Sequence, residues 1–297
     1  MRHLTKFVAL SSAVLLGSSL LAACGGSESA DKTATDVTAD TGLSAKVPDA
    51  VKKDGVILVG SDASYAPSEF LSTDNKTVEG FDVDLFDAVA AKLGLKSKFE
   101  NAKFDSIIPG VASGKYEVGV SSFTINAERM KQANMISYYS AGTQWFTAKG
   151  NPDGIDPDDA CGEKVAVQTN TVQIDDLAAR NKECADAGKP EIKVDSYQGQ
   201  DQATAAIVSG KDSAGLADSP VGAYAVKQTN GKLELLGDIY DSAPYGYVVP
   251  KDQTDFADAI SAAVNELIKD GTYLEILKKW GVDQGAVTGS EVNPSAG

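Results

Sequence analysis

KFENAKFDSIIPGVASGKYEVGVSS at residues 98–122 and KVDSYQGQDQATAAIVSGKDSAGLAD at residues 193–218 follow one plan. Each stretch predicts a short strand, a helix that ends in Ser-Gly-Lys, and a second strand. Gly114 and Gly210 stand where the C-terminus of a helix favours a residue with positive φ. In the first copy, apolar residues recur at the i, i+3, i+4 and i+7 spacing of a helix with one buried face. These residues are Phe104, Ile107, Ile108 and Val111.

This repeat predicts the fold class. Strand–helix–strand units of this length are typical of parallel sheets with crossover connections, and apolar strands at residues 56–59 and 165–167 precede the two copies. We therefore expect an α/β protein with two lobes of similar plan, each a sheet flanked by helices. Ligands of open α/β sheets bind beyond the carboxyl ends of the strands. Ser122 and Asp218, which end the two copies, should then face each other across the gap between the lobes.

Two helices are predicted near the C-terminus, separated by Asp270-Gly271. The first covers residues 256–269 and has an apolar stripe formed by Phe256, Ile260, Val264 and Leu267. The second has Tyr273, Ile276, Leu277 and Trp280 on one face. We expect these aromatic side chains to belong to the core.

Residues 1–23 have the features of a secretory signal peptide. Arg2 and Lys6 precede an apolar stretch that is too short and wrongly flanked for a membrane-spanning helix. The stretch ends in small residues before Cys24, and this resembles a bacterial lipobox, whose Cys becomes the acylated first residue. The alternative is an ordinary signal peptide in which Cys24 has no role. Residues 24–47 are rich in Gly, Ser, Thr, Ala and Asp, which predicts a lipidated, disordered linker.

These features predict a location and a redox state. We expect a protein at the cell surface, lipid-anchored to the outer face of the cytoplasmic membrane, which is periplasmic if the host has an outer membrane. With Cys24 lipidated, Cys161 and Cys184 remain, and an even number of Cys in an exported protein suggests one disulfide. The alternative is two buried thiols. Two Cys without a nearby His are too few for a zinc site.

Charge and histidine content exclude several function classes. The only His is His3, so the exported chain has no His for a Ser-His-Asp triad or a Cys-His pair. Without Arg2 and Lys6, 25 basic residues face 42 acidic residues, a formal net charge of −17. Binding to nucleic acid needs a basic surface, and this composition argues against it. Glycine-rich phosphate loops are also absent from the sequence, and we expect neither a cofactor nor a metal.

Between about residues 56 and 281 the chain resembles the bacterial extracellular solute-binding proteins of family 3, the receptors of polar amino acid ABC transporters. The order and spacing of several motifs together carry this resemblance. They are Ser64-Tyr65-Ala66-Pro67, Gly80-Phe81-Asp82-Val83-Asp84-Leu85, Phe104-Asp105-Ser106-Ile107-Ile108-Pro109, Ser122 to Arg129, Ser196-Tyr197-Gln198-Gly199-Gln200, Ala217-Asp218 and Lys269-Asp270-Gly271-Thr272-Tyr273.

The resemblance implies a type II periplasmic-binding-protein-like fold, whose two lobes are joined by two hinge strands and close on a ligand. Lobe 1 would comprise residues 48–143 plus 242–285, lobe 2 residues 144–241, and a polar tail residues 286–297. Gly142 and Gly246 lie near the expected hinges, where small residues can absorb a rotation of the backbone.

The resemblance also implies how the ends of a free amino acid are held. Arg129 matches the Arg that binds the ligand carboxylate, and its planar fork can donate two parallel hydrogen bonds. Ser122 and Thr124 match contacts to the same end, and Thr171 and Val172 match the start of a helix whose free N–H groups face the carboxylate. Asp218 matches the acceptor of the ligand ammonium. Read from the residues alone, Arg129 would be a solvated residue at a helix start and Asp218 a surface residue in a turn.

Three further residues match positions around the ligand side chain. Tyr65 and Phe104 match aromatic walls, although Phe104 is equally explained as ordinary core. Asp62 matches an acceptor of hydrogen bonds from the side chain, and Glu69 could reinforce it. The resemblance therefore implies a pocket that favours an amide or a cation over a second carboxylate.

We expect from the resemblance a monomeric lipoprotein that is not an enzyme. It would capture a polar or cationic amino acid and deliver it to an ABC transporter permease. One alternative is an enzyme on the same scaffold, such as a dehydratase or a lyase, because fold does not fix function. Another is a sensor or adhesion module.

Overall fold

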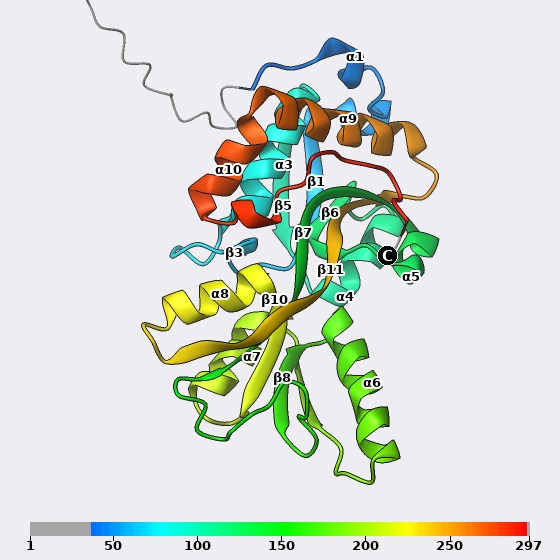
Figure 1. The fold of residues 1–297 in the computed structure, drawn as a ribbon. Helices are drawn as coiled ribbons and strands as arrows, with labels where there is room; N and C mark the ends of the chain where they lie inside the picture. Colours follow the sequence, from blue (N-terminus) through cyan, green and yellow to red (C-terminus); the bar gives the residue numbers. More distant parts are fainter. Residues whose placement is uncertain (1–36, 296–297) are drawn as a thin grey trace, which may run out of the picture. The chain divides into compact units, whose positions relative to one another are not determined.

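The computed structural model describes residues 37–295. The predicted signal peptide, the lipidation site at Cys24 and residues 25–36 of the predicted linker lie outside this range. Figure 1 shows the fold. The strands are β1 (Val56–Ser61), β2 (Ser64–Tyr65), β3 (Glu69–Leu71), β4 (Val78–Glu79), β5 (Lys96–Asn101), β6 (Val118–Thr124), β7 (Ala133–Ala148), β8 (Lys164–Gln168), β9 (Lys193–Tyr197), β10 (Ala214–Asp218) and β11 (Leu233–Pro250).

The helices are α1 (Thr41–Ser44), α2 (Asp49–Lys52), α3 (Phe81–Lys92), α4 (Phe104–Ala112), α5 (Ala127–Gln132), α6 (Val172–Asp186), α7 (Gln200–Val208), α8 (Ser219–Gln228), α9 (Thr254–Asp270), α10 (Thr272–Trp280) and the short 3₁₀ helix η2 (Asp283–Gly285). Helices alternate with strands from α3 to β7 and from β8 to α9. None of the helices within residues 37–295 is long and apolar enough to cross a membrane.

The predicted α/β class and the repeat are both confirmed. Over the described residues, eight strands form one sheet in the order β5-β1-β6-β11-β7-β10-β8-β9. In the first copy, β5 and β6 flank β1 in parallel, and in the second copy β9 and β10 flank β8 in parallel. Strands β2, β3 and β4 form a separate small sheet.

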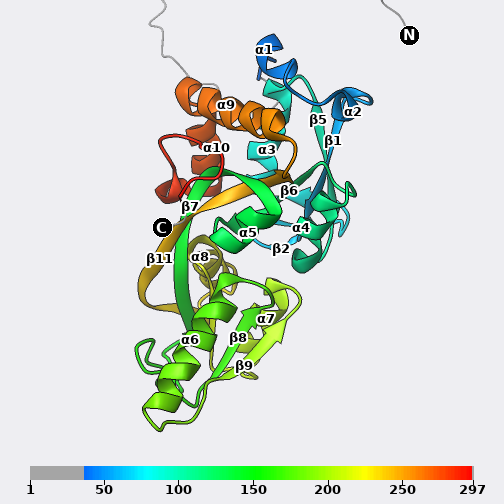
Figure 2. The same cartoon turned by 90° about the vertical axis from the view of Figure 1, so that its right-hand side faces the viewer.

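Strands β7 and β11 connect the two copies. They pair antiparallel over most of their length, with β6 on the other side of β11 and β10 on the other side of β7. Figure 2 shows them running from the elements around β1 to the elements around β8. We call the elements around β1, β5 and β6 the first half, and those around β8, β9 and β10 the second half.

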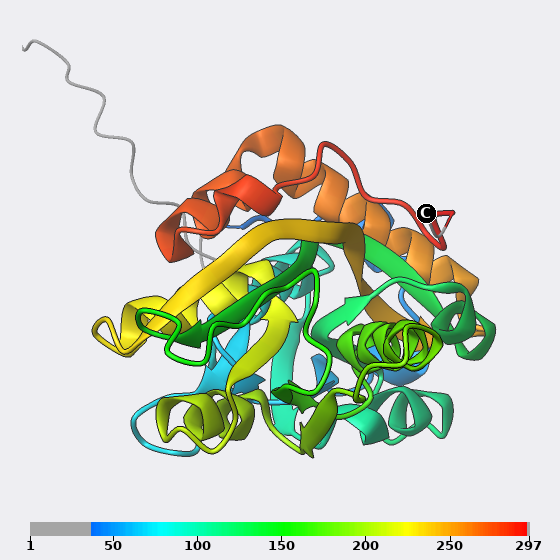
Figure 3. The same cartoon turned by 60° about the horizontal axis from the view of Figure 1, so that its bottom comes forward.

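In Figure 3, β11 (gold) arches beneath the orange helices α9 and α10.

Each half has its own apolar core. The larger cluster of the first half lies between the strands and helices α3, α9 and α10, and the predicted stripe of α9 is fully buried in it. A second cluster of the first half contains the predicted apolar face of α4. The second half has two smaller clusters on the two faces of its strands, around Phe146 and Trp145. The left-handed conformation predicted at helix ends is present, with φ values of 75° at Gly114 and 73° at Gly210.

The prediction of disorder up to residue 47 is wrong for its last part. Helix α1 begins after Asp40, whose Oδ1 accepts hydrogen bonds from the N–H groups of Gly42 and Leu43. Val47 is 2% exposed, and Val37 and Leu43 pack against the core of the first half. These few apolar residues are spaced so that they reach the core while the polar residues between them face outward.

The predicted polar tail also packs against the sheet. Val292 forms a bridge with Ile136 of β7. The N–H of Ser137 donates to the carbonyl of Glu291 at 2.9 Å, and the N–H of Asn293 donates to the carbonyl of Met135 at 2.7 Å. Backbone hydrogen bonds, which do not depend on apolar side chains, hold this segment.

Cys161 and Cys184 form a disulfide with a Cα–Cα distance of 5.7 Å. It joins the segment before β8 to α6, and Cys184 is buried in a core of the second half. No cluster of three or more potential metal-ligating side chains occurs within residues 37–295.

We predict that the disulfide stabilises the second half by about 3 kcal/mol, because it closes a loop of the unfolded chain. The double variant Cys161→Ala/Cys184→Ala should lose about that much unfolding free energy in urea denaturation. A reductant should destabilise the wild type to the same extent and leave the double variant unchanged. Equal stability of the wild type and the double variant would contradict this assignment.

Candidate functional site

One pocket gathers all the residues that the sequence proposes for ligand binding except Glu69. Its lining comprises Asp62, Tyr65, Phe104, Ser121, Ser122, Thr124, Arg129, Gln168, Thr171, Val172, Gln173 and Asp218. The pocket lies between the two halves, because residues up to 129 belong to the first half and residues from 168 belong to the second. Ser122 and Asp218 therefore meet at one site, as the repeat predicts.

Strand ends build this pocket. Asp62 follows β1, Ser122 and Thr124 end β6, Gln168 ends β8 and Asp218 ends β10. The carboxyl ends of the parallel strands of both halves point to the same gap, which is the usual place of a ligand in open α/β sheets.

The end of β6 has an unusual backbone. Ser122 has a φ of 48°, in the left-handed region that residues other than Gly, Asn and Asp seldom adopt. Neighbouring side chains of a strand normally point to opposite faces. The turn at Ser122 breaks this alternation, and Ser121 and Ser122 both line the pocket.

Arg129, from α5 of the first half, lines the pocket. Its Nη1 donates to the carbonyl of Thr124 at 2.8 Å and its Nη2 to the carbonyl of Asn170 in the second half at 3.1 Å. The guanidinium lies over the rings of Phe104 and Phe123, 5.4 and 5.6 Å from their centroids. Burial lowers the pKa of Arg129, and the carboxylate of Asp218 opposes this shift. Two of its five donors are used, so others are available to an anion.

Asp218 is 6% exposed and is held in a fixed orientation. Its Oδ1 accepts from Nε2 of Gln173 at 2.8 Å and its Oδ2 from the hydroxyl of Tyr245 at 2.7 Å. Its N–H donates to the hydroxyl of Tyr65 at 3.2 Å. Burial raises the pKa of Asp218, and the hydrogen bonds from Tyr245, Tyr65 and Gln173 and the charge of Arg129 oppose this shift.

Asp62 forms the acidic group at the other side of the pocket. Its Oδ1 accepts from Oγ of Ser64 at 2.6 Å. Its Oδ2 accepts from the N–H of Phe104 at 3.0 Å and from Nε2 of Gln168 at 3.0 Å. Burial raises the pKa of Asp62. Gln168 thus reaches across from the second half to an acid of the first half.

Direct hydrogen bonds join the two halves around the pocket, so the structure has them in contact. The aromatic ring of Tyr65, from the first half, also packs into a core cluster of the second half. The bonds join Gln168 to Asp62, Arg129 to Asn170, Asp218 to Tyr65, and the N–H of Gln200 to Ser64.

Helix α6 begins at the pocket. Thr171 is its N-cap residue, and the Thr171 hydroxyl donates to the carbonyl of Gln168 at 2.8 Å. Asn170 has a φ of 59°. Many left-handed turns use Gly, but Asn tolerates this conformation too, so the loop keeps the shape that places the helix start at the pocket.

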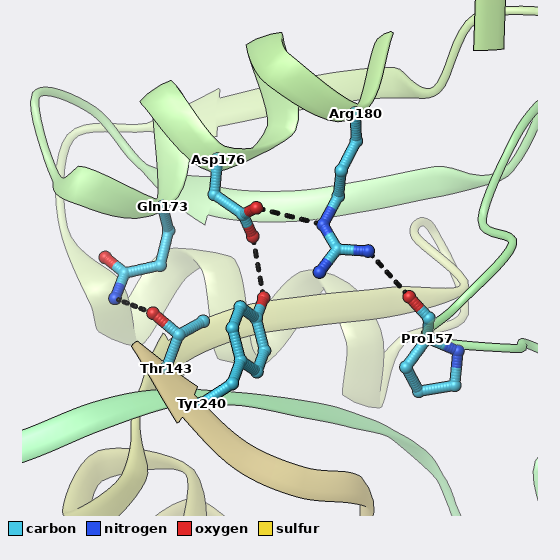
Figure 4. A network of polar contacts seen from close by, with 6 residues as sticks. All are labelled: Thr143, Pro157, Gln173, Asp176, Arg180 and Tyr240. Atoms are coloured by element: carbon cyan, nitrogen blue, oxygen red, sulfur yellow. Dashed lines mark hydrogen bonds and ion pairs between the residues drawn. The ribbon is translucent and has the colours of Figure 1, made fainter. Parts of the chain in front are cut away.

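A polar network fastens α6 to the two connecting strands (Figure 4). Nε2 of Gln173 donates to Oγ1 of Thr143 on β7 at 3.1 Å. One turn later, Asp176 accepts from the hydroxyl of Tyr240 on β11 at 2.6 Å and from Nε of Arg180 at 3.0 Å. Arg180 also donates to the carbonyl of Pro157 at 2.7 Å. The start of α6 is therefore fixed relative to the strands that connect the halves.

Sequence reasoning missed three contributors to the site, which are Gln168, Ser121 and Gln173, and misplaced one. Gln168 ends a predicted strand, so the strand-end rule could have found it, whereas Ser121 becomes a lining residue only through the turn at Ser122. Gln173 has no signal in the sequence. Val172 lines the pocket beside Thr171. Glu69 was expected beside Asp62 near the ligand, but it is fully buried and bonds to Ser121 behind the pocket.

Comparison with known proteins identifies the family to which the sequence is similar. Residues 57–283 match the bacterial extracellular solute-binding proteins, family 3. The chain is similar to the arginine-binding protein ArgT of Corynebacterium glutamicum, with 36% identity over 252 residues, which cover 84% of this chain and 82% of that protein.

Solved structures agree with this family. An ancestral arginine-binding protein bound to arginine is similar with a TM-score of 0.70 and 34% identity, covering 76% of this chain and 98% of that chain. The ancestral amino acid-binding protein AncCDT-1, a precursor of cyclohexadienyl dehydratase, is similar with a TM-score of 0.67 and 30% identity, covering 78% and 97%.

Proposed function

Because the chain belongs to the bacterial extracellular solute-binding proteins of family 3, we propose that it captures a cationic amino acid, arginine foremost, and delivers it to an ABC importer. The pocket between the two halves is the capture site. The similarity to ArgT and to an arginine-bound ancestral protein supports this choice of ligand.

The charge of the pocket carries the proposal. Two carboxylates, Asp62 and Asp218, and one guanidinium, Arg129, line it, so ionised negative groups exceed positive groups by one. A neutral zwitterion leaves this excess uncompensated in a buried site, which is costly. An amino acid with a cationic side chain supplies the missing positive charge. Arginine is therefore favoured over glutamine and over acidic amino acids.

Each end of the ligand has a partner. The free donors of Arg129 and the N–H groups at the start of α6 suit the α-carboxylate. Ser122 and Thr124 lie beside this end, and Thr171 is the residue directly before the first turn of the helix. Asp218, already oriented by two hydrogen bonds, suits the α-ammonium. The rings of Tyr65 and Phe104 would flank the side chain, and Asp62 would accept from its guanidinium.

Capture would depend on movement of the two halves as lobes. We propose residues 48–143 plus 242–285 as lobe 1 and residues 144–241 as lobe 2, with hinges in β7 and β11. A Cβ at Gly142 would lie 2.5 Å from the carbonyl oxygen of Tyr240, and the β7–β11 register shifts on both sides of Tyr240. A ligand that bridges Arg129 and Asp218 binds the closed state better than the open state, which shifts the equilibrium to closure.

The protein would release its ligand unchanged. The two pocket carboxylates are already committed to hydrogen bonds that orient them, which suits binding more than proton transfer. The related precursor of a dehydratase is itself an amino acid-binding protein by name. Turnover of a bound amino acid would favour the enzyme alternative.

A lipid on Cys24 would keep the monomeric protein at the membrane beside its permease. Tethering raises the effective concentration of the protein at its partner. The supporting observations are the signal peptide and the lipobox-like sequence before Cys24.

We predict that Arg129→Ala and Asp218→Asn each weaken arginine binding by at least about 2–5 kcal/mol, because each leaves one buried charge without its partner. Isothermal titration calorimetry of the full chain measures this loss. The matched control is Lys131→Ala, which removes an exposed cation from the same helix as Arg129 and should bind normally. Wild-type affinity in either pocket variant contradicts the site.

We predict that Asp62→Asn changes the preference among ligands. Arginine should lose about tenfold or more in affinity, because its side chain loses a charged acceptor. Glutamine should lose much less or gain, because the excess negative charge is gone. A thermal-shift screen of the wild type and the variant against the twenty amino acids measures this preference. A ligand at about 100 times its Kd adds about 2.7 kcal/mol of stability, which the screen detects. An unchanged arginine-to-glutamine ratio contradicts the role of Asp62.

We predict that the full chain, expressed in bacteria, incorporates labelled fatty acid and fractionates with membranes. Cys24→Ala should lose the label and the membrane association, because no thiol remains at the lipobox. Labelling that survives the substitution, or a wild type without label, contradicts the anchor.

A further inference from the structure

Two carboxyl groups lie behind the pocket and outside its lining. Glu69 begins β3 and Asp82 lies in the first turn of α3, and both are 0% exposed. The hydroxyl oxygen of Ser122 lies 3.5 Å from Oε2 of Glu69 and 3.2 Å from Oδ2 of Asp82, so the two carboxyl groups are close neighbours. Neither forms an ion pair with a Lys or Arg of the described residues.

The hydrogen bonds of the pair are unequal. Oδ2 of Asp82 accepts from the hydroxyl of Tyr138 at 2.5 Å, and from both the N–H and the hydroxyl of Ser122 at 3.2 Å. Glu69 accepts from the hydroxyl of Ser121 at 3.1 Å and lies 3.5 Å from the hydroxyl of Ser122. Asp82 thus has the donors that an ionised carboxylate needs.

Two buried carboxyl groups in contact cannot both ionise at low cost, so such a pair retains one proton. Burial, then the charge of Asp82, raises the pKa of Glu69 well above its ordinary value. Burial raises the pKa of Asp82 to about 6, against the opposing hydrogen bonds from Tyr138 and Ser122. Glu69 is therefore the acid and Asp82 the carboxylate at neutral pH.

The surroundings contain no compensating cation among the described residues. The titratable groups that face the pair are all acids or phenols. They are Asp62 and Tyr65 toward Glu69, and Tyr138, Tyr139 and Tyr247 toward Asp82.

The pair is connected to the lining of the pocket at two points. The hydroxyl of Ser121 donates to Glu69 and accepts from the N–H of Asp62 at 3.0 Å. Ser122, in its left-handed conformation, gives both its N–H and its hydroxyl hydrogen to Asp82. The residue after β1 and the end of β6 are thus oriented from behind by one carboxyl pair.

We propose that Glu69 and Asp82 share one buried proton and act as positioning residues for Asp62, Ser121 and Ser122, so that protonation of the second carboxyl weakens amino acid binding. This inference rests on the proposed function for its affinity measurements. A second proton converts one oxygen of Asp82 into a donor, and Asp82 then holds the N–H and hydroxyl of Ser122 less firmly.

The pair makes affinity and stability change in opposite directions with pH. Affinity should fall as the pH falls through about 6, where Asp82 binds its proton. The folded state binds this proton more tightly than the unfolded state, whose Asp has its ordinary pKa of 3.8. The stability that Asp82 contributes therefore rises as the pH falls from about 6 to 4. A residue with only a structural role would change both quantities in the same direction.

We test the proposal by titrating the full chain with arginine at about pH 7.5 and about pH 5. The wild type should lose about tenfold in affinity at the lower pH. Asp82→Asn should bind about tenfold or more weakly at the higher pH, because its amide cannot replace the charged acceptor. Its further loss at the lower pH should be smaller than that of the wild type, because the amide does not titrate. Its unfolding temperature should lack the rise that Asp82 gives the wild type on acidification.

One further variant tests the shared proton, and another serves as a matched control. Glu69→Gln should stay within about threefold of the wild type at neutral pH, because its amide N–H donates to Asp82 as the acid does. Asp87→Asn removes another carboxylate of α3, which bonds to Ser97 away from the pocket, and should bind normally. A Glu69→Gln variant as weak as Asp82→Asn overturns the shared proton, and a wild-type affinity that is constant over this pH range overturns the role in binding.

A measurement without ligand separates this proposal from the proposed function. The infrared C=O stretch of a buried protonated carboxyl should be present in the wild type at neutral pH and absent in Glu69→Gln. If the wild type shows this band but binds no amino acid, the shared proton is supported, whereas the proposed function and the role of the pair in binding are overturned. Arginine binding without the band overturns the shared proton alone.

Discussion

The antiparallel pairing of β7 with β11 is the constraint on which the site depends. Strand β11 is in register with β6 of the first half, strand β7 is in register with β10 of the second half, and β7 and β11 pair with each other. The carboxyl ends of two parallel strand groups are thereby brought to one gap. Asp62 and Arg129 come from one side of this gap, and Asp218 and Gln168 from the other. The network of Asp176, Tyr240 and Arg180 then fixes the start of α6 to the same strands.

The structure also buries four carboxyl groups at or near the pocket. Asp62 and Asp218 line the pocket, and Glu69 and Asp82 lie directly behind it. Each has a pKa raised by burial, so each costs stability at neutral pH. A core built for stability alone would contain apolar residues here. The two proposals above explain this cost. The acids of the pocket would bind a cationic ligand, and Asp82 orients the turn at Ser122.

Much of the site could be predicted from the sequence because it follows from strand ends. The repeat alone predicts that Ser122 and Asp218 meet, and family motifs add Arg129. What could not be predicted depends on contacts between segments far apart in sequence. Gln173 is placed by Thr143 of β7, and Glu69 is held behind the pocket by the hydroxyl of Ser121. The order of residues 37–47 was missed because composition hides the few apolar residues that reach the core.

The arrangement of the cores has a consequence for the order of assembly. The core of the first half uses residues from Val47 to Val282, including those of α9 and α10. One core of the second half uses only residues from Trp145 to Tyr240. During synthesis from the N-terminus, the strands of the second half are complete before the last helices of the first half, α9 and α10, are made. The largest core thus closes only when nearly the whole chain has been synthesised.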